Sequence, residues 1–219
     1  MFRRIFNKMK IKSLDCLDYD IVAEYYFNEL KDNEIMKKFF KDYKIMGIQL
    51  VPDPVIRKHY DNKDIKITDF SLDNQNKKNN IYFYIKQHFV DFHIIYDEKV
   101  NIVPIDIDPH DSDHKKMLKY TLNIMKEDYD NIIVVDTGGR GNHVIALLDK
   151  FIDIDIAKDL ADNIAHEVVS KFDNAVNKPP KKGEVRIDIS TFHIGGSLRI
   201  PGSINYKTCK PSRIIYTTK

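Results

Sequence analysis

The sequence of 219 residues contains no tryptophan, only two cysteines and only eight glycines. The cysteines, Cys16 and Cys209, are too few for a disulfide framework or a four-cysteine zinc site. No apolar run approaches the roughly 20 residues that span a bilayer. The basic N-terminal stretch also lacks the uninterrupted apolar segment of a signal peptide. We therefore expect a cytoplasmic protein in a reducing compartment, with no membrane partner and no zinc site.

An excess of charge of one sign is also missing. The 35 Lys and Arg residues nearly balance the 33 Asp and Glu residues, which leaves a formal net charge of +2. A nucleic-acid-binding surface would therefore depend on local clustering of basic residues rather than on total charge. Hydrophobic residues make up 42% of the chain, enough to form a packed core.

Apolar periodicity predicts an α+β fold. Strand-like segments rich in Ile, Val, Phe and Tyr lie at 81–90, 92–97, 101–108, 131–136, 143–148, 184–190 and 213–218. Helical spacing of apolar residues occurs at 14–46, 111–130 and 153–175. The β-α-β-β-α-β order from residue 101 onward is that of a ferredoxin-like, RRM-like antiparallel sheet. We expect an N-terminal accessory α/β module over 1–100 and an RRM-like catalytic module over 101–219, together forming one domain.

Three carboxylates lie on predicted strands. Asp106 and Asp108 of the IDID run are two residues apart, so they share one face of a strand while Ile105 and Ile107 face the core. Asp188 of RIDIS is placed in the same way on a later strand. Carboxylates on apolar strands are costly unless a cation meets them, and Mg²⁺ or Mn²⁺ prefer oxygen ligands. The alternative is a half-exposed strand with a solvated polar face.

A similar Asp-x-Asp spacing occurs at Asp153 and Asp155, where a helical pattern begins. We assign these two residues to the start of that helix. His110 and His114 have HxxxH spacing, which would also suit a metal site, but a loop and helix start is the interpretation that we favour.

Glycine and arginine are scarce, and both concentrate in two segments. Six of the eight glycines lie in TGGRGNH (137–143) and in the stretch GGSLRIPGSINYKT (195–208). Only seven arginines accompany 28 lysines, yet Arg140, Arg186 and Arg199 lie in or beside the motifs. Glycine permits close backbone approach to an anion, and arginine binds phosphate oxygens in bidentate geometry. These segments are therefore candidates for phosphate binding, although an isolated GGRG also suits a plain hairpin tip.

In their order and spacing, IDID, TGGRGNH, RIDIS and LRIPGSINYKT resemble the archaeo-eukaryotic primase superfamily. That superfamily includes primase small subunits, primase-polymerases and the polymerase domains of bacterial end-joining ligases. The resemblance covers residues 100–210. It implies a catalytic metal-binding triad: Asp106, Asp108 and Asp188. It also implies a nucleotide-binding set from two segments: Thr137, Gly139, Arg140, His143, Arg199, Ser203, Asn205 and Lys207.

The resemblance implies a DNA primase-polymerase that adds NTPs or dNTPs to a 3′-hydroxyl on single-stranded DNA template and primer, using two Mg²⁺ or Mn²⁺ ions. Initiation of primers de novo is a further expectation. The small size resembles that of stand-alone primase-polymerases, including those encoded beside CRISPR adaptation genes. The expected partners are therefore further domains, replication proteins or CRISPR adaptation proteins. Two alternatives stay open: a non-catalytic RRM-like nucleic-acid-binding module, and a metal-dependent nuclease or cyclase on a palm-like sheet.

Overall fold

The computed structural model of the chain describes residues 47–50, 56–58, 89–93, 98–192, 197–199, 201, 204–205, 208 and 210–218. The helical segment expected at 14–46 lies outside these residues. Of the strands expected at 81–90 and 92–97, only 89–93 is described. The predicted site residues Ser203 and Lys207 also lie outside the described part.

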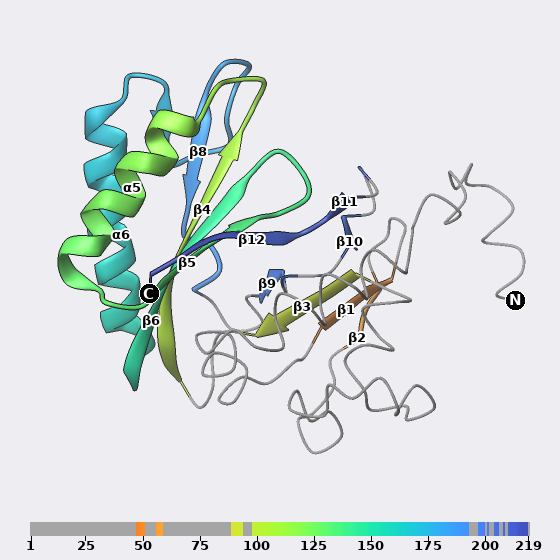
Figure 1. The fold of residues 1–219 in the computed structure, drawn as a ribbon, viewed down its shortest axis with the longest axis vertical. Helices are drawn as coiled ribbons and strands as arrows, with labels where there is room; N and C mark the ends of the chain where they lie inside the picture. Colours follow the sequence, from red (N-terminus) through yellow and green to blue (C-terminus); the bar gives the residue numbers. More distant parts are fainter. Residues whose placement is uncertain are drawn as a thin grey trace, which may run out of the picture.

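A six-stranded sheet dominates the described part of the chain (Figure 1). Its strands, in spatial order, are β12 (Arg213–Thr217), β5 (Ile132–Asp136), β6 (Asn142–Asp153), β4 (Lys99–Pro109), β8 (Val185–Asp188) and β7 (Ala175–Val176). Four neighbouring strands of this sheet, in the spatial order β5, β6, β4 and β8, pair antiparallel, so β6 and β4 lie in the centre. This is the strand order of the ferredoxin-like β-α-β-β-α-β unit, so the predicted α+β class is confirmed.

Both helices of the described part cover one face of this sheet (Figure 1). In α5 (Lys115–Asp128), Met117, Thr121 and Met125 are buried at a spacing of four residues. In α6 (Ile154–Lys171), alanines recur at the same spacing, and their small side chains let the helix lie close to the strands. The fully buried Ile105 and Ile107 belong to the same core as these helix residues. The opposite face of β4 therefore carries Asp106 and Asp108.

Two smaller sheets contain the remaining strands. One has the order β2 (Ile56–Lys58), β1 (Gly47–Leu50), β3 (Phe89–His93) and β9 (Ser197–Arg199). The other pairs β10 (Ile204–Asn205) with β11 (Lys210–Pro211). Strand β9 follows the six-stranded sheet's β8 in the chain but pairs with β3, so one sheet joins segments on either side of residue 100.

Several element boundaries differ from those expected. α5 begins at Lys115 rather than near residue 111, because Asp111 has a left-handed backbone (φ 55°) that a helix cannot contain. β6 extends to Asp153, where it pairs with Lys99, instead of ending at residue 148. The short parallel strand β7 falls at the end of the helix predicted at 153–175, which in the structure ends at Lys171.

Asp153 is the N-cap residue of α6 and Asp155 lies in its first turn, as the sequence predicts, although Asp153 makes no side-chain cap hydrogen bond. None of the helices in the described residues is long and apolar enough to cross a membrane.

Candidate active site

The three carboxylates singled out in the sequence lie on neighbouring strands. Asp106 and Asp108 share a face of β4, and Asp188 of β8 is the direct cross-strand partner of Asp106. Side chains of residues paired in this way project to the same face, with Cβ atoms about 4.5–5.5 Å apart. The Asp106 side chain is 30% exposed and that of Asp188 is 16% exposed. The structure thus places all three on the face opposite the helices.

Negative charge at this face is only partly balanced. The pKa of the Asp106 carboxyl is raised to about 7, first by burial and then by the charges of Asp108 and Asp188, against the lowering effect of Arg199 and Arg186. Arg186, the cross-strand partner of Asp108, places Nη1 2.8 Å from Asp188 Oδ2. The arginines therefore offset part of the repulsion among the carboxylates, and the site favours an additional cation.

His143 lies on the other side of Asp106. It is the cross-strand partner of Asp106 on β6, and its Nε2 lies 3.7 Å from Asp106 Oδ1. Burial lowers the pKa of the imidazole to about 3, and the nearby Arg199 contributes to the shift. His143 is therefore neutral near neutral pH. Its buried Nδ1 has no hydrogen-bond partner among the described residues.

The glycine hairpin between β5 and β6 is held by its own side chains. Gly138 has φ 67°, and its N–H donates to Asp136 Oδ1 at 2.8 Å. Thr137 Oγ1 donates to the carbonyl oxygen of Gly141 at 2.9 Å and accepts from the N–H of Gly139 at 3.4 Å. The N–H groups of Gly138 and Gly139 thus already have partners within the turn. The hairpin is a preorganised turn, rather than a loop with every N–H free to bind an anion.

Residues from the C-terminal segment contact this hairpin. Arg199 Nη1 donates to the Thr137 carbonyl oxygen at 2.8 Å, and Thr208 Oγ1 donates to the carbonyl oxygen of Gly138. The buried Asn205 packs so closely on Gly139 that a Cβ at Gly139 would lie 2.7 Å from Asn205 Nδ2. The structure therefore brings Arg199 and Asn205 to the hairpin.

Arg140 is placed differently. Its side chain is 59% exposed at the hairpin tip, and Nη1 lies 3.9 Å from Asp111 Oδ1. His110 Nδ1 lies 3.5 Å from the other oxygen of Asp111, and His114 Nε2 lies 2.6 Å from Asn142 Oδ1. The two histidines of the HxxxH spacing therefore contact different partners at the start of α5.

Three residues that make contacts at this site were not among the predicted site residues: Arg186, Asp136 and Thr208. A signal existed for Arg186, because it precedes Asp188 by two residues on a strand and belongs to a scarce residue type. Asp136 directly precedes the hairpin, where Asp commonly bonds to a backbone N–H two residues later. For Thr208 the sequence carries no local signal, because its partner Gly138 is distant in the chain.

The donor set of the cluster fits a hard divalent cation, because carboxylate oxygens are the ligands that Mg²⁺ and Mn²⁺ prefer. The pKa of Asp106 is raised first by burial and then by the charges of Asp108 and Asp188, so a bound cation would favour its ionised form. As they stand, however, no three His, Cys, Asp or Glu side chains in the described ranges could hold a metal ion. The Arg186–Asp188 ion pair turns one carboxylate oxygen of the cluster toward a guanidinium.

Comparison with solved structures identifies the fold. The polymerase domain of Ligase D from Mycobacterium tuberculosis, solved in complex with DNA, superposes with a TM-score of 0.60 over 92% of this chain and 84% of that chain. The chain shares the fold of that polymerase domain. With 12% identity, the likeness to that polymerase domain lies in the fold and not in the sequence.

The AEP domain of the cyanophage S-2L primase-polymerase gives a TM-score of 0.48 and 10% identity over 92% of this chain and 91% of that chain. No protein-family model and no curated protein matches the sequence.

Proposed function

We propose that the chain is a template-dependent nucleotidyltransferase, a DNA primase-polymerase that adds NTPs or dNTPs to a 3′-hydroxyl. The observation that carries this proposal is the row His143–Asp106–Asp188 across β6, β4 and β8, on the sheet face opposite the helices. The site combines three clustered carboxylates, a neutral imidazole and a nearby glycine hairpin, within a fold shared with a solved polymerase domain. Single-stranded DNA template and primer are the proposed polymeric substrates.

Asp106, Asp108 and Asp188 are the residues that would hold Mg²⁺ or Mn²⁺. When bound, two such ions lower the pKa of an attacking hydroxyl and stabilise the charge of a leaving pyrophosphate. The carboxylates have to be ionised for this, and cation binding would lower the pKa of Asp106 from its raised value. The charge of Asp106 thus depends on the cation.

The remaining side chains are proposed to bind the triphosphate. His143 is buried and neutral, so it forms no ion pair with Asp106. Its ring N–H is proposed to donate a hydrogen bond to a phosphate. Arg199 adds positive charge near His143 and Asp106 while its Nη1 contacts the hairpin. Arg140 is exposed, so its guanidinium is free to turn from Asp111 toward a phosphate. Ser203 and Lys207 stay predicted members of the pocket.

The division into an accessory module (1–100) and a catalytic module (101–219) is part of this proposal. The pairing of β3 with β9 supports their action as one domain, because Arg199 lies on the strand that joins the two segments. A nucleic-acid-binding module without chemistry is not favoured, because three carboxylates on one face would repel phosphate in the absence of a cation.

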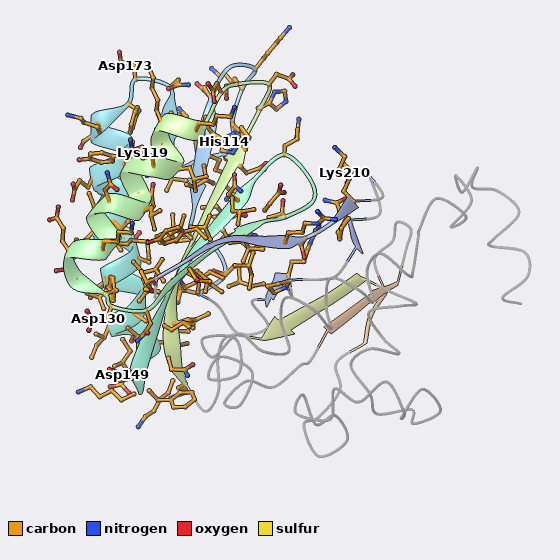
Figure 2. All side chains as sticks on the ribbon, viewed as in Figure 1. His114, Lys119, Asp130, Asp149, Asp173 and Lys210 are labelled. Carbon is orange, nitrogen blue, oxygen red and sulfur yellow. The ribbon has the colours of Figure 1, made fainter. Side chains whose placement is uncertain are left out.

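Primer extension tests the proposal directly. A labelled primer on single-stranded template is incubated with dNTPs or NTPs and Mn²⁺ or Mg²⁺, with wild-type protein and with Asp106→Ala/Asp108→Ala. The matched control is Asp128→Ala/Asp130→Ala, which removes two exposed carboxylates of the same spacing at the end of α5 (Figure 2). We expect template-directed products from the wild type and the control, and none from the first variant. Equal synthesis by all three proteins would contradict the proposal, and omission of the primer tests initiation.

A further inference from the structure

Arg186 occupies a position inside the carboxylate cluster. It lies on β8 two residues before Asp188, so both side chains project to the same face. Its cross-strand partner on β4 is Asp108. Arg186 Nη1 and Asp188 Oδ2 are 2.8 Å apart, which is the distance of a strong charge-assisted hydrogen bond. A positive side chain is therefore built into the place where a divalent cation would be expected.

The Arg186–Asp188 ion pair is partly buried, but not every donor of the guanidinium is bonded within the described residues. The side chains of Arg186 and Asp188 are 29% and 16% exposed, so neither charge is fully solvated. The Nε of Arg186 is buried and has no hydrogen-bond partner within the described ranges. The guanidinium is thus held through Nη1 rather than by a network that fixes all of its donors.

We propose that Arg186 is a resident counter-ion that neutralises the carboxylate cluster in the metal-free protein and leaves Asp188 when a divalent cation binds. This inference rests on the proposed function, because it concerns the same three carboxylates. One Asp188 oxygen accepts from Arg186 and the other from the Ser190 N–H at 2.7 Å, so a metal ion has to compete with these donors for Asp188. A guanidinium beside the site also repels a divalent cation. Arg186 therefore stabilises the metal-free fold and weakens metal binding, which makes occupancy dependent on the metal concentration.

Metal binding can be measured without any nucleotidyl transfer. Free Mn²⁺ is followed by electron paramagnetic resonance while the protein is titrated, for the wild type and for Arg186→Gln. We expect Arg186→Gln to bind Mn²⁺ at least about fivefold more tightly, because a neighbouring positive charge has been removed. In EDTA, the same variant is expected to melt at a lower temperature than the wild type, and saturating Mn²⁺ is expected to narrow that difference.

Two variants control for charge and for shape. Lys119→Gln removes one exposed positive charge from α5, on the helix-covered side of the sheet (Figure 2), and is expected to bind Mn²⁺ as the wild type does. Arg186→Lys keeps the charge and is expected to retain an affinity close to that of the wild type. Arg186→Gln with unchanged or weaker Mn²⁺ affinity would overturn the counter-ion role.

Asp106→Asn/Asp108→Asn separates this inference from the proposed function. If that variant binds Mn²⁺ as tightly as the wild type, the cluster is not the metal site and the proposed function fails. If it loses Mn²⁺ while Arg186→Gln gains nothing, only the counter-ion role fails.

A measurement on the wild type covers the case in which Arg186→Gln does not fold. The Nε–Hε resonance of Arg186, assigned by its absence in Arg186→Lys, is followed by NMR during Mg²⁺ addition. We expect it to shift as the ion pair with Asp188 opens, while the resonance of Arg213, an exposed residue of the edge strand β12, does not. An Arg186 resonance that stays fixed while Mg²⁺ saturates the site would overturn the inference.

Discussion

Asp106 and Asp188, distant in the sequence, are direct cross-strand partners on neighbouring strands of the six-stranded sheet. Their strands β4 and β8 place both carboxylates on the face that the helices leave uncovered. His143 lies beside Asp106 on β6, and Arg186 bonds to Asp188 from the same strand, β8. This arrangement concentrates titratable groups, and the consequences can be measured in the metal-free protein.

The Asp106–His143 pair predicts an unusual dependence of stability on pH. The pKa of Asp106 rises on folding from 3.8 to about 7, so this group alone makes stability fall as pH rises through that window. The pKa of His143 falls on folding from 6.5 to about 3, so this group alone makes stability fall as pH drops through its window. The two effects oppose each other where the windows overlap, so we expect a nearly flat contribution from the pair in wild type.

Single variants should reveal each effect. In EDTA, Asp106→Asn should lose stability as pH falls below 6.5, because only the histidine effect remains. His143→Gln should lose stability as pH rises toward 7, because only the carboxyl effect remains. After allowance for solvent screening, each change amounts to about 1–2 kcal/mol. Urea denaturation across this pH range measures both slopes, and parallel profiles for the two variants would contradict the account.

Two glycines with positive φ offer a matched test of the hairpin. A Cβ on Gly138 would lie 2.5 Å from the carbonyl oxygen of Lys210 and 2.9 Å from that of Pro211. A Cβ on Gly183 would meet nothing within 4 Å. Both alanine variants have the left-handed backbone cost of about 1–2 kcal/mol. Only Gly138→Ala adds a clash with backbone, so it should be less stable than Gly183→Ala by at least about 1 kcal/mol in urea unfolding. Equal losses would mean that the hairpin does not fit closely against Lys210 and Pro211.

Two buried threonines allow a comparison between a hydroxyl that makes hydrogen bonds and a hydroxyl that makes none within the described residues. Thr137→Val removes the hydroxyl that bonds to Gly141 and Gly139, and should cost about 1–2 kcal/mol of stability. Thr121 Oγ1 is buried in α5 without a hydrogen-bond partner in the described part, so Thr121→Val should be neutral or stabilising. In primer extension, Thr137→Val should raise the KM for nucleotide while Thr121→Val leaves it unchanged. Similar stability losses for both would be inconsistent with the hydrogen bonds of the hairpin.

The sequence predicted those features that depend on local pattern. Alternation within IDID placed Asp106 and Asp108 on one face, and the glycine-rich linker predicted the β5–β6 hairpin. The pairing of β4 with β8 follows from the ferredoxin-like order, which required the whole element series and not any one motif. The identity of the site as a nucleotidyl-transfer centre stays a prediction.

Other features depend on contacts that local pattern does not encode. The Arg186–Asp188 ion pair requires knowledge of rotamers, because Arg186 was equally able to face Asp108 across the strands. Strand β7 is only two residues long, too short for any periodicity. The contacts of Arg199 and Thr208 with the hairpin join segments remote in sequence, so only the folded chain reveals them.

Template-directed incorporation of a single nucleotide by Asp188→Asn tests the central claim most directly. The matched control is Asp173→Asn, which neutralises an exposed carboxylate after the end of α6 (Figure 2). If the carboxylates of β4 and β8 form one catalytic cluster, Asp188→Asn should lower the incorporation rate by at least about 100-fold, with Asp173→Asn unchanged. Incorporation by Asp188→Asn at the wild-type rate would contradict the account.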